Sequence, residues 1–222
     1  MNFAVIFDMD GVLIDSLSPN LKGHQAALKH FGADVTLKDI EEDMHMSMQD
    51  KITKWKYKYG VKVNEKDYIE KAVEEQLKFL HNLEVKQEIK DLLIALKENK
   101  VKTAIATNSP LSKTKAMLTK LKIAKYFDVI VTSEDVTKHK PNPEMFLLAA
   151  TRLNIMPERC VVFEDAGTGV LAATAAGMKA VGVQTEFNTK EELKHADVII
   201  KNFKEINYQK ITELIKKTTN QL

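Results

Sequence analysis

Two aspartates follow directly on a short, unbroken apolar run near the start of the chain. The run reads FAVIF over residues 3–7, and Asp8-Met9-Asp10-Gly11 comes next. A run of this length, rich in β-branched and aromatic residues, is typical of a strand buried on both faces of a parallel sheet. Its carboxyl end is where open α/β sheets bind ligands. Because the two carboxylates repel each other there, we expect a cation beside them.

The same design recurs three times further along the chain. Apolar segments at 101–106, 127–131 and 160–163 each end in polar or charged residues. The residues that follow them are Thr107-Asn108-Ser109, then Thr132-Ser133-Glu134-Asp135 with Lys140-Pro141 shortly beyond, then Glu164-Asp165. One polar loop after a strand is common, but parallel strands point their carboxyl ends to one edge of a sheet. We therefore expect the four clusters to converge on one site.

Helical patterns separate these strands, so the chain alternates helix and strand as a doubly wound α/β fold does. Helices are predicted at 87–98, 112–121, 143–153, 168–176 and around 206–215, and further strands at 180–183 and 198–200. About 85 residues separate the first strand from the next parallel one, far more than a crossover helix needs. We expect residues 17–83 to form a helical unit inserted into a core of residues 1–16 and 84–222.

The inserted region has its own helical spacing. Leu21, His24 and Leu28 lie on one face of a predicted helix. Residues 52–59 and 67–80 predict two more helices, while residues 39–48 predict a helix or a loop.

The stretch 51–66 mixes lysines with aromatic residues, which can indicate nucleic-acid binding. We favour a packed stripe that includes Trp55, with the lysines on the solvated face.

The motifs come in an order that resembles haloacid dehalogenase superfamily phosphohydrolases, in the branch with β-phosphoglucomutase and small-metabolite phosphatases. The resemblance runs from Asn2 to around Ile200. It rests on DMDGVLIDS at 8–16, TNS at 107–109, KPNPE at 140–144 and FEDAGTG at 163–169. It implies a Rossmann-like α/β core with an inserted α-helical cap. The implied activity is phosphoric monoester hydrolysis of a small phosphorylated metabolite.

The resemblance also implies roles for the acidic residues. Asp8 is the expected nucleophile, which forms an aspartyl-phosphate, and Asp10 is the expected acid and base. The expected cofactor is Mg²⁺, which prefers carboxylates, phosphate oxygens and water. Its expected ligands are Asp8, Asp10, Glu164 and Asp165, with Asp165 favoured for direct coordination.

Three further residues are expected to bind phosphate. Thr107 offers a hydroxyl and Asn108 an amide, and Lys140 suits a point charge that also offsets the carboxylates. Lys138 competes with Lys140, but family spacing places the lysine directly before the proline. His139 is expected to be a solvated loop residue.

The cap sequence favours hydrolysis over intramolecular phosphotransfer. The phosphoglucomutases typically have a histidine where this chain has Asn20, and an arginine close to where it has Met48. Without a cationic fork for a second phosphate, a bisphosphate is hard to retain. The mutase reaction remains the alternative. Substrate contacts are expected from residues 16–20 and 45–49 of the cap.

The composition indicates which binding partners and which cellular compartment to expect. The 33 Lys and Arg residues nearly balance 31 Asp and Glu, so nucleic acid and anionic membranes are not expected as main partners. Cys160 is the single cysteine, which excludes an internal disulfide and fits a reducing compartment. The sequence shows no signal peptide or membrane span. We expect a cytoplasmic protein that is a monomer or a weak dimer.

Overall fold

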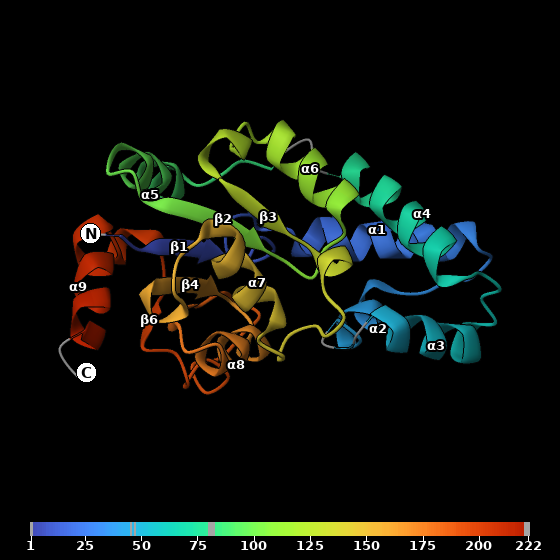
Figure 1. Ribbon diagram of the computed structural model, residues 1–222. Coiled ribbons are helices and arrows are strands. Elements are labelled where there is room, and N and C mark those ends of the chain that lie inside the picture. The colour runs from blue at the N-terminus through green and yellow to red at the C-terminus, as the bar shows by residue number, and fades with distance from the viewer. Residues whose placement is uncertain (1, 45, 47, 80–82, 220–222) are drawn as a thin grey trace. The chain divides into compact units, whose positions relative to one another are not determined.

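The computed structural model describes residues 2–44, 46, 48–79 and 83–219. The chain divides into two compact units. One unit, the core, consists of residues 1–15 and 84–222; the other consists of residues 16–83, and we name it the cap after the inserted unit expected from the sequence. Helices and strands follow one another along the chain in the order labelled in Figure 1.

A six-stranded parallel sheet runs through the core in the order β3-β2-β1-β4-β5-β6 (Figure 1). Its strands are β1 (Ala4–Phe7), β2 (Lys102–Ala106), β3 (Val129–Val131), β4 (Cys160–Glu164), β5 (Lys179–Val183) and β6 (Val198–Ile200). The apolar β1 is central, with Phe7 paired to Ile105 on one side and Phe163 on the other. The predicted doubly wound parallel fold is confirmed. The carboxyl ends of β1, β2 and β4 therefore lie side by side.

Helices cover both faces of this sheet. They are α5 (Gln87–Glu98), α6 (Leu111–Lys120), α7 (Glu144–Leu153), α8 (Gly167–Ala175) and α9 (Tyr208–Thr219). Against α7 and α8, alternate strand residues such as Ile6 and Val162 form one buried cluster. Their neighbours point to the opposite face, where Phe163 stacks between Phe7 and Phe203 at centroid distances of 5.0 and 5.5 Å. Burial of both faces explains the unbroken apolar runs of the strands.

The strand predicted at 127–131 is shorter than expected. It begins at Val129, after the 3-10 helix η1 (Ala124–Tyr126). The Asp128 carboxylate accepts a hydrogen bond from the Thr103 backbone N–H at 2.8 Å, and the Asp128 N–H donates to the Thr103 carbonyl at 2.9 Å. The Thr103 N–H therefore bonds the side chain of Asp128 in place of a backbone carbonyl. The other 3-10 helices are η2 (Ser133–Asp135), η3 (Pro157–Arg159) and η4 (Phe203–Glu205).

The cap contains α1 (Leu17–His30), α2 (Leu37–Glu42), α3 (Met48–Tyr59) and α4 (Glu65–Lys78). The predicted stripes are buried: Trp55 is 1% exposed and His24 3%. His24 Nδ1 lies 2.9 Å from the Tyr68 hydroxyl, which joins α1 to α4. Gly23 permits this approach, because a Cβ there would lie 2.2 Å from Gln76 Cγ. His24 is thus a packed residue, as predicted.

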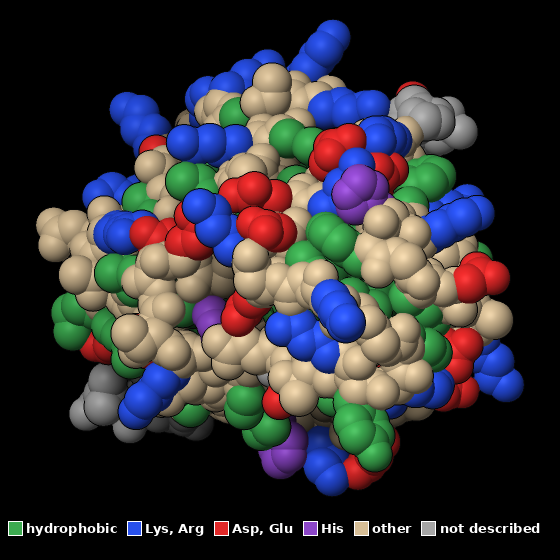
Figure 2. All heavy atoms as spheres, turned by 90° about the vertical axis from the view of Figure 1, so that its right-hand side faces the viewer, with side chains coloured by type: hydrophobic (Ala, Val, Ile, Leu, Met, Phe, Trp, Pro, Cys, Tyr) green, Lys and Arg blue, Asp and Glu red, His purple; other side chains and the backbone are tan. Residues whose placement is uncertain are grey.

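The lysines of α3 do not all lie on the solvated face. Lys54, Lys56 and Lys58 are exposed as predicted, but Lys51 is buried and its Nζ lies 3.9 Å from Met44 Sδ. On the face of the molecule drawn in Figure 2, basic side chains are interspersed with acidic ones. None of the helices in the described ranges combines the length and apolar character that crossing a membrane requires.

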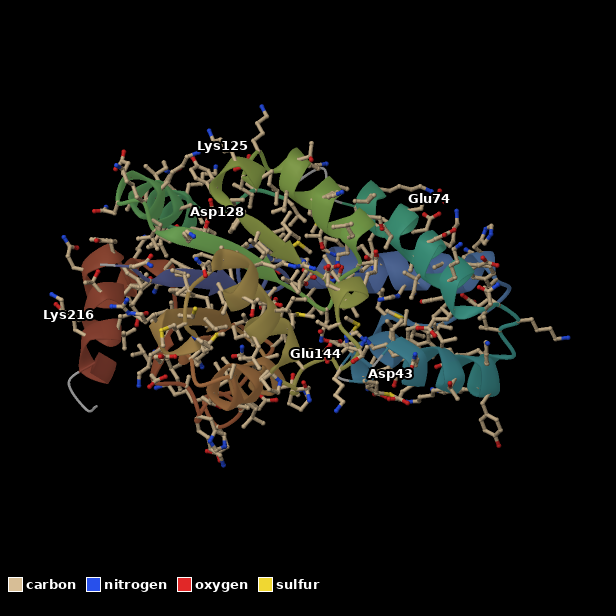
Figure 3. All side chains as sticks on the ribbon, in the orientation of Figure 1. Asp43, Glu74, Lys125, Asp128, Glu144 and Lys216 are labelled. Carbon is tan, nitrogen blue, oxygen red and sulfur yellow. The ribbon has the colours of Figure 1, made fainter. Side chains whose placement is uncertain are left out.

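A buried aspartate connects α2 to α3 within the cap. Asp43 lies just after α2 (Figure 3), and its side chain is 2% exposed. Its carboxylate accepts a hydrogen bond from Trp55 Nε1 at 2.8 Å and a second from Lys54. Burial alone would raise the pKa of Asp43, but the bonds from Lys54 and Trp55 bring it below its usual range.

We predict that Asp43→Ala destabilises the cap by about 1–3 kcal/mol at neutral pH, because the buried Trp55 N–H loses its acceptor. A carboxyl with a lowered folded-state pKa stabilises the protein above its unfolded pKa and loses that effect as pH falls through the folded value. The difference from wild type should therefore shrink below about pH 4. Urea unfolding followed by fluorescence of Trp55, the single tryptophan, measures this. The exposed Asp34→Ala is the control; equal stability of both variants would contradict the prediction.

Candidate active site

The carboxylate of Asp8 lies at the carboxyl end of β1 and is buried. Its backbone N–H donates to the Phe163 carbonyl at 2.9 Å, which continues the β1–β4 pairing to the end of the strand. The chain then turns at Gly11, whose φ is +83°. The Gly11 N–H donates to the Ile14 carbonyl at 2.8 Å and closes this turn. Asp8 thus follows directly on a buried strand, and the chain turns three residues later at a residue without a side chain.

Lys140 reaches the acids from a loop before α7. Its Nζ donates to Asp8 Oδ1 at 2.7 Å, to Glu164 Oε1 at 2.5 Å and to the Ala106 carbonyl at 2.9 Å. An ammonium has three N–H donors, and these three acceptors satisfy them all. The side chain is 4% exposed. Lys140 therefore ties together the carboxyl ends of β1, β2 and β4.

The loop that carries Lys140 is held by Glu144 at the start of α7 (Figure 3). The Glu144 carboxylate accepts hydrogen bonds from the backbone N–H groups of Thr137 at 2.9 Å and Lys138 at 3.0 Å. Lys138 and His139 are exposed. Of the two competing lysines, Lys140 is the one that meets the acids.

Three carboxylates meet at this edge of the sheet. The ligand oxygens of Asp8, Glu164 and Asp165 lie within 4.8 Å of one another, which makes them the group of described residues able to share a metal ion. Glycines make room for them. A Cβ at Gly11 would lie 1.9 Å from Asp165 Oδ2, and one at Gly169 would lie 2.0 Å from Glu164 Oε1. The glycines of the two motifs are thus required by close approach of carboxylates.

Burial, together with neighbouring carboxylates, shifts the pKa values of these acids. Burial raises the pKa of Asp8 to about 7, with a further increase from Glu164, against the lowering effect of Lys140. Burial and the neighbouring Glu164 likewise raise the pKa of Asp165 well above its usual range. Although burial opposes it, contact with Asp8 and Glu164 holds the pKa of Lys140 above its usual value. One lysine does not balance three carboxylates, so the donor set fits a divalent cation.

Asn188 positions Asp165, a role that the sequence did not indicate. Its Nδ2 donates to the Asp165 carbonyl at 2.7 Å and to the Val183 carbonyl at 2.9 Å, which links the loop after β4 to the end of β5. A lone asparagine after a strand has many uses, and no signal in one sequence marks this one.

Asp10 is held separately from the three clustered acids. Its carboxylate oxygens lie 2.9 and 3.1 Å from Lys113 Nζ, and Oδ2 also accepts a bond from the Ser109 hydroxyl at 2.7 Å. Both partners belong to the segment after β2. Ser109 lies within the TNS motif, but the sequence does not indicate its contact with Asp10. The sequence does not indicate a site role for Lys113 either. The assignment of Asp10 as a metal ligand remains a prediction.

The two other expected phosphate ligands follow β2. Thr107 is 1% exposed, and its hydroxyl oxygen accepts a hydrogen bond from the Ser109 N–H at 3.1 Å. Asn108 is exposed. Both follow β2, which lies beside β1, so they lie at the edge of the sheet where we expected the polar clusters to meet.

The cap residues expected to contact substrate are only partly described. Asn20 and Ser16 are buried in the cap, and Asn20 Nδ2 donates to Ser16 Oγ at 3.4 Å. His45 and Ser47 lie outside the described residues. Met48 begins α3.

Known proteins resemble this chain along most of its length. The family model for haloacid dehalogenase-like hydrolases matches residues 5–183. A phosphorylated carbohydrates phosphatase of Thermotoga maritima is 34% identical over 203 residues, covering 88% of this chain and 92% of that protein. The fructose-1-phosphate phosphatase YqaB of Escherichia coli is 30% identical over 185 residues, covering 81% and 95%. The crystal structure of β-phosphoglucomutase from Clostridium difficile matches with a TM-score of 0.82 at 26% identity, covering 98% of each chain.

Proposed function

Because the chain belongs to the haloacid dehalogenase-like hydrolase family, we propose that it is a Mg²⁺-dependent phosphatase that cleaves a small phosphorylated metabolite through an aspartyl-phosphate. The family match confirms the superfamily and enzyme class that the motif order predicted, and relatives that are phosphatases support phosphoric monoester hydrolysis. One observation carries the proposal. The Asp8 carboxylate, fixed by Lys140 at 2.7 Å, lies among acids at the carboxyl end of the central strand.

The proposed reaction has two steps on Asp8. A carboxylate oxygen of Asp8 attacks phosphorus, the bond from phosphorus to the ester oxygen breaks, and that oxygen takes a proton from Asp10. Water then attacks phosphorus, gives a proton to Asp10, and releases phosphate with the Asp8 carboxylate restored. The bond from Lys140 to Oδ1 holds the Asp8 carboxylate in one orientation at the end of β1.

A divalent cation fits the acidic group, and we propose Asp8, Glu164 and Asp165 as the side chains that hold it, with Asp10 nearby. When bound, Mg²⁺ would neutralise charge on the phosphoryl oxygens and on the crowded acids. The chain's own residues do the rest. Asn188 holds the backbone of Asp165, and Gly11 keeps the approach to its carboxylate open.

Thr107, Asn108 and Lys140 are proposed to bind the transferring phosphoryl group. The Thr107 hydroxyl and the Asn108 amide follow β2, which is paired directly with β1. Lys140 adds a fixed positive charge beside Asp8. Preorganised donors of this kind stabilise charge that develops on phosphoryl oxygens in the transition state.

Sugar phosphates are the substrate class we propose. The similar Thermotoga maritima protein is a phosphatase of phosphorylated carbohydrates, and the Escherichia coli protein is a fructose-1-phosphate phosphatase. We propose that the unit of residues 16–83 is the cap that selects among such esters. A cytoplasmic location and a monomer or weak dimer remain predictions of the sequence.

We predict that Asp8→Asn lowers kcat by several orders of magnitude while the fold is retained, because the amide is nearly isosteric but not nucleophilic. Steady-state phosphate release measures this, with mass spectrometry to exclude deamidation. The control is Asp91→Asn on the exposed side of α5. Retention of more than about a tenth of wild-type activity by Asp8→Asn would contradict the nucleophile assignment.

Chelation of divalent metal should abolish phosphate release, and Mg²⁺ should restore it. Ca²⁺ should restore it poorly, because it takes more ligands at longer distances and would disturb the in-line geometry. Activity is measured after dialysis against chelator and readdition of each ion. Full turnover in excess chelator would rule out this mechanism.

Intramolecular phosphotransfer is the second candidate, favoured by the match to a β-phosphoglucomutase over 98% of the chain. We expect hydrolysis instead, since the chain has Asn20 and Met48 where the mutases have cationic residues. Incubation with β-glucose 1-phosphate and a trace of glucose 1,6-bisphosphate distinguishes the two reactions. We predict free phosphate with little glucose 6-phosphate; rapid conversion to glucose 6-phosphate would establish the mutase.

A further inference from the structure

Lys113 is a buried cation beside Asp10 that belongs to no motif recognised in the sequence. Its side chain is 6% exposed, whereas that of Asp10 is 25% exposed. Nζ lies within 3.1 Å of both Asp10 carboxylate oxygens and 3.0 Å from Ser109 Oγ. A molecule that approaches from solvent therefore meets the Asp10 carboxylate rather than the ammonium behind it.

The three side chains form a closed arrangement. The ammonium of Lys113 has three N–H donors, which match the two Asp10 oxygens and the Ser109 oxygen. The Ser109 hydroxyl in turn donates to Asp10 Oδ2 at 2.7 Å. Ser109 is itself fixed, because its N–H donates to the Thr107 hydroxyl oxygen at 3.1 Å. Asp10 is thus held on two sides by groups anchored at the end of β2 and the start of α6.

We propose that Lys113 is a positioning residue which, with Ser109, holds the Asp10 carboxylate where it exchanges a proton with the ester oxygen. This inference rests on the proposed function. The alternative is that Lys113 binds an anionic group of the substrate, a role that would not depend on the leaving group. Lys140 fixes the nucleophile at β1, and Lys113 does the same for the acid and base.

The proposal predicts a dependence on the leaving group. When the bond from phosphorus to the ester oxygen breaks, an alkoxide needs the proton of Asp10, but 4-nitrophenolate leaves without one. The ratio kcat/KM reports steps up to formation of the aspartyl-phosphate, and so isolates this proton transfer. Displacing Asp10 should therefore impair alkyl esters far more than aryl esters.

The test compares Lys113→Met, Lys113→Arg and the exposed Lys115→Met of the same helix. The substrates are fructose 1-phosphate, phosphoglycolate and 4-nitrophenyl phosphate. For Lys113→Met we expect kcat/KM to fall about 10- to 100-fold for both alkyl esters and less than about threefold for the aryl ester. A displaced Asp10 would lose part of the roughly 10²- to 10⁴-fold that general acid catalysis contributes. Lys113→Arg should restore part of the loss, and Lys115→Met should behave as wild type.

Two outcomes would overturn the inference. Equal losses on all three esters, in protein that melts like wild type, would mean a structural role only. A loss confined to phosphoglycolate would mean that Lys113 binds the substrate's anionic group. If Lys113→Met does not fold, the alkyl-to-aryl ratio of Lys113→Arg decides the question. Failure of the proposed function is distinguishable, because then wild type would hydrolyse none of the esters or Asp8→Asn would remain active.

Discussion

Mutual repulsion among three carboxylates determines which charged groups the active site must contain. Asp8, Glu164 and Asp165 come within 4.8 Å of one another at the carboxyl ends of β1 and β4. Lys140 supplies one positive charge, which leaves an excess of negative charge when all three acids are ionised. Burial raises the pKa of Asp8, and the neighbouring Glu164 adds to that increase, while Lys140 opposes it. A divalent cation would balance that excess, and its remaining coordination positions would accept oxygens of a phosphate ester.

The fold makes that crowding unavoidable. β1 pairs with β2 and β4 along its length, and stacking of Phe7 on Phe163 at 5.0 Å buries the last pair of strand residues. The residues that follow must then emerge side by side at one edge. Gly11 and Gly169 allow the carboxylates to come closer than any side chain at those positions would permit. Apolar burial on both faces of the sheet thus offsets the repulsion between these carboxylates.

The sequence was sufficient to predict the sheet and the convergence of Asp8, Lys140 and the Glu164-Asp165 pair, because parallel strands bring their carboxyl ends to one edge. It was not sufficient to predict that Lys113 and Asn188 contact the site. Their contacts depend on how α6 and the loop after β5 are placed, and neither residue type is distinctive. For Lys51 the prediction was wrong. Its charge indicated a residue on the solvated face, but its position on the helix buries it. Periodicity predicts which face a residue occupies better than it predicts tertiary partners.

If Asp8 carries the phosphoryl group during turnover, the phosphorylated enzyme can be captured. Rapid mixing of enzyme, Mg²⁺ and a turned-over phosphate ester, acid quenching within one turnover, and mass spectrometry of the digested protein would locate the added phosphate. We expect a phosphorylated peptide containing Asp8 in wild type and none in Asp8→Asn. Phosphate on another residue, or turnover in which no phosphorylated protein forms, would contradict it.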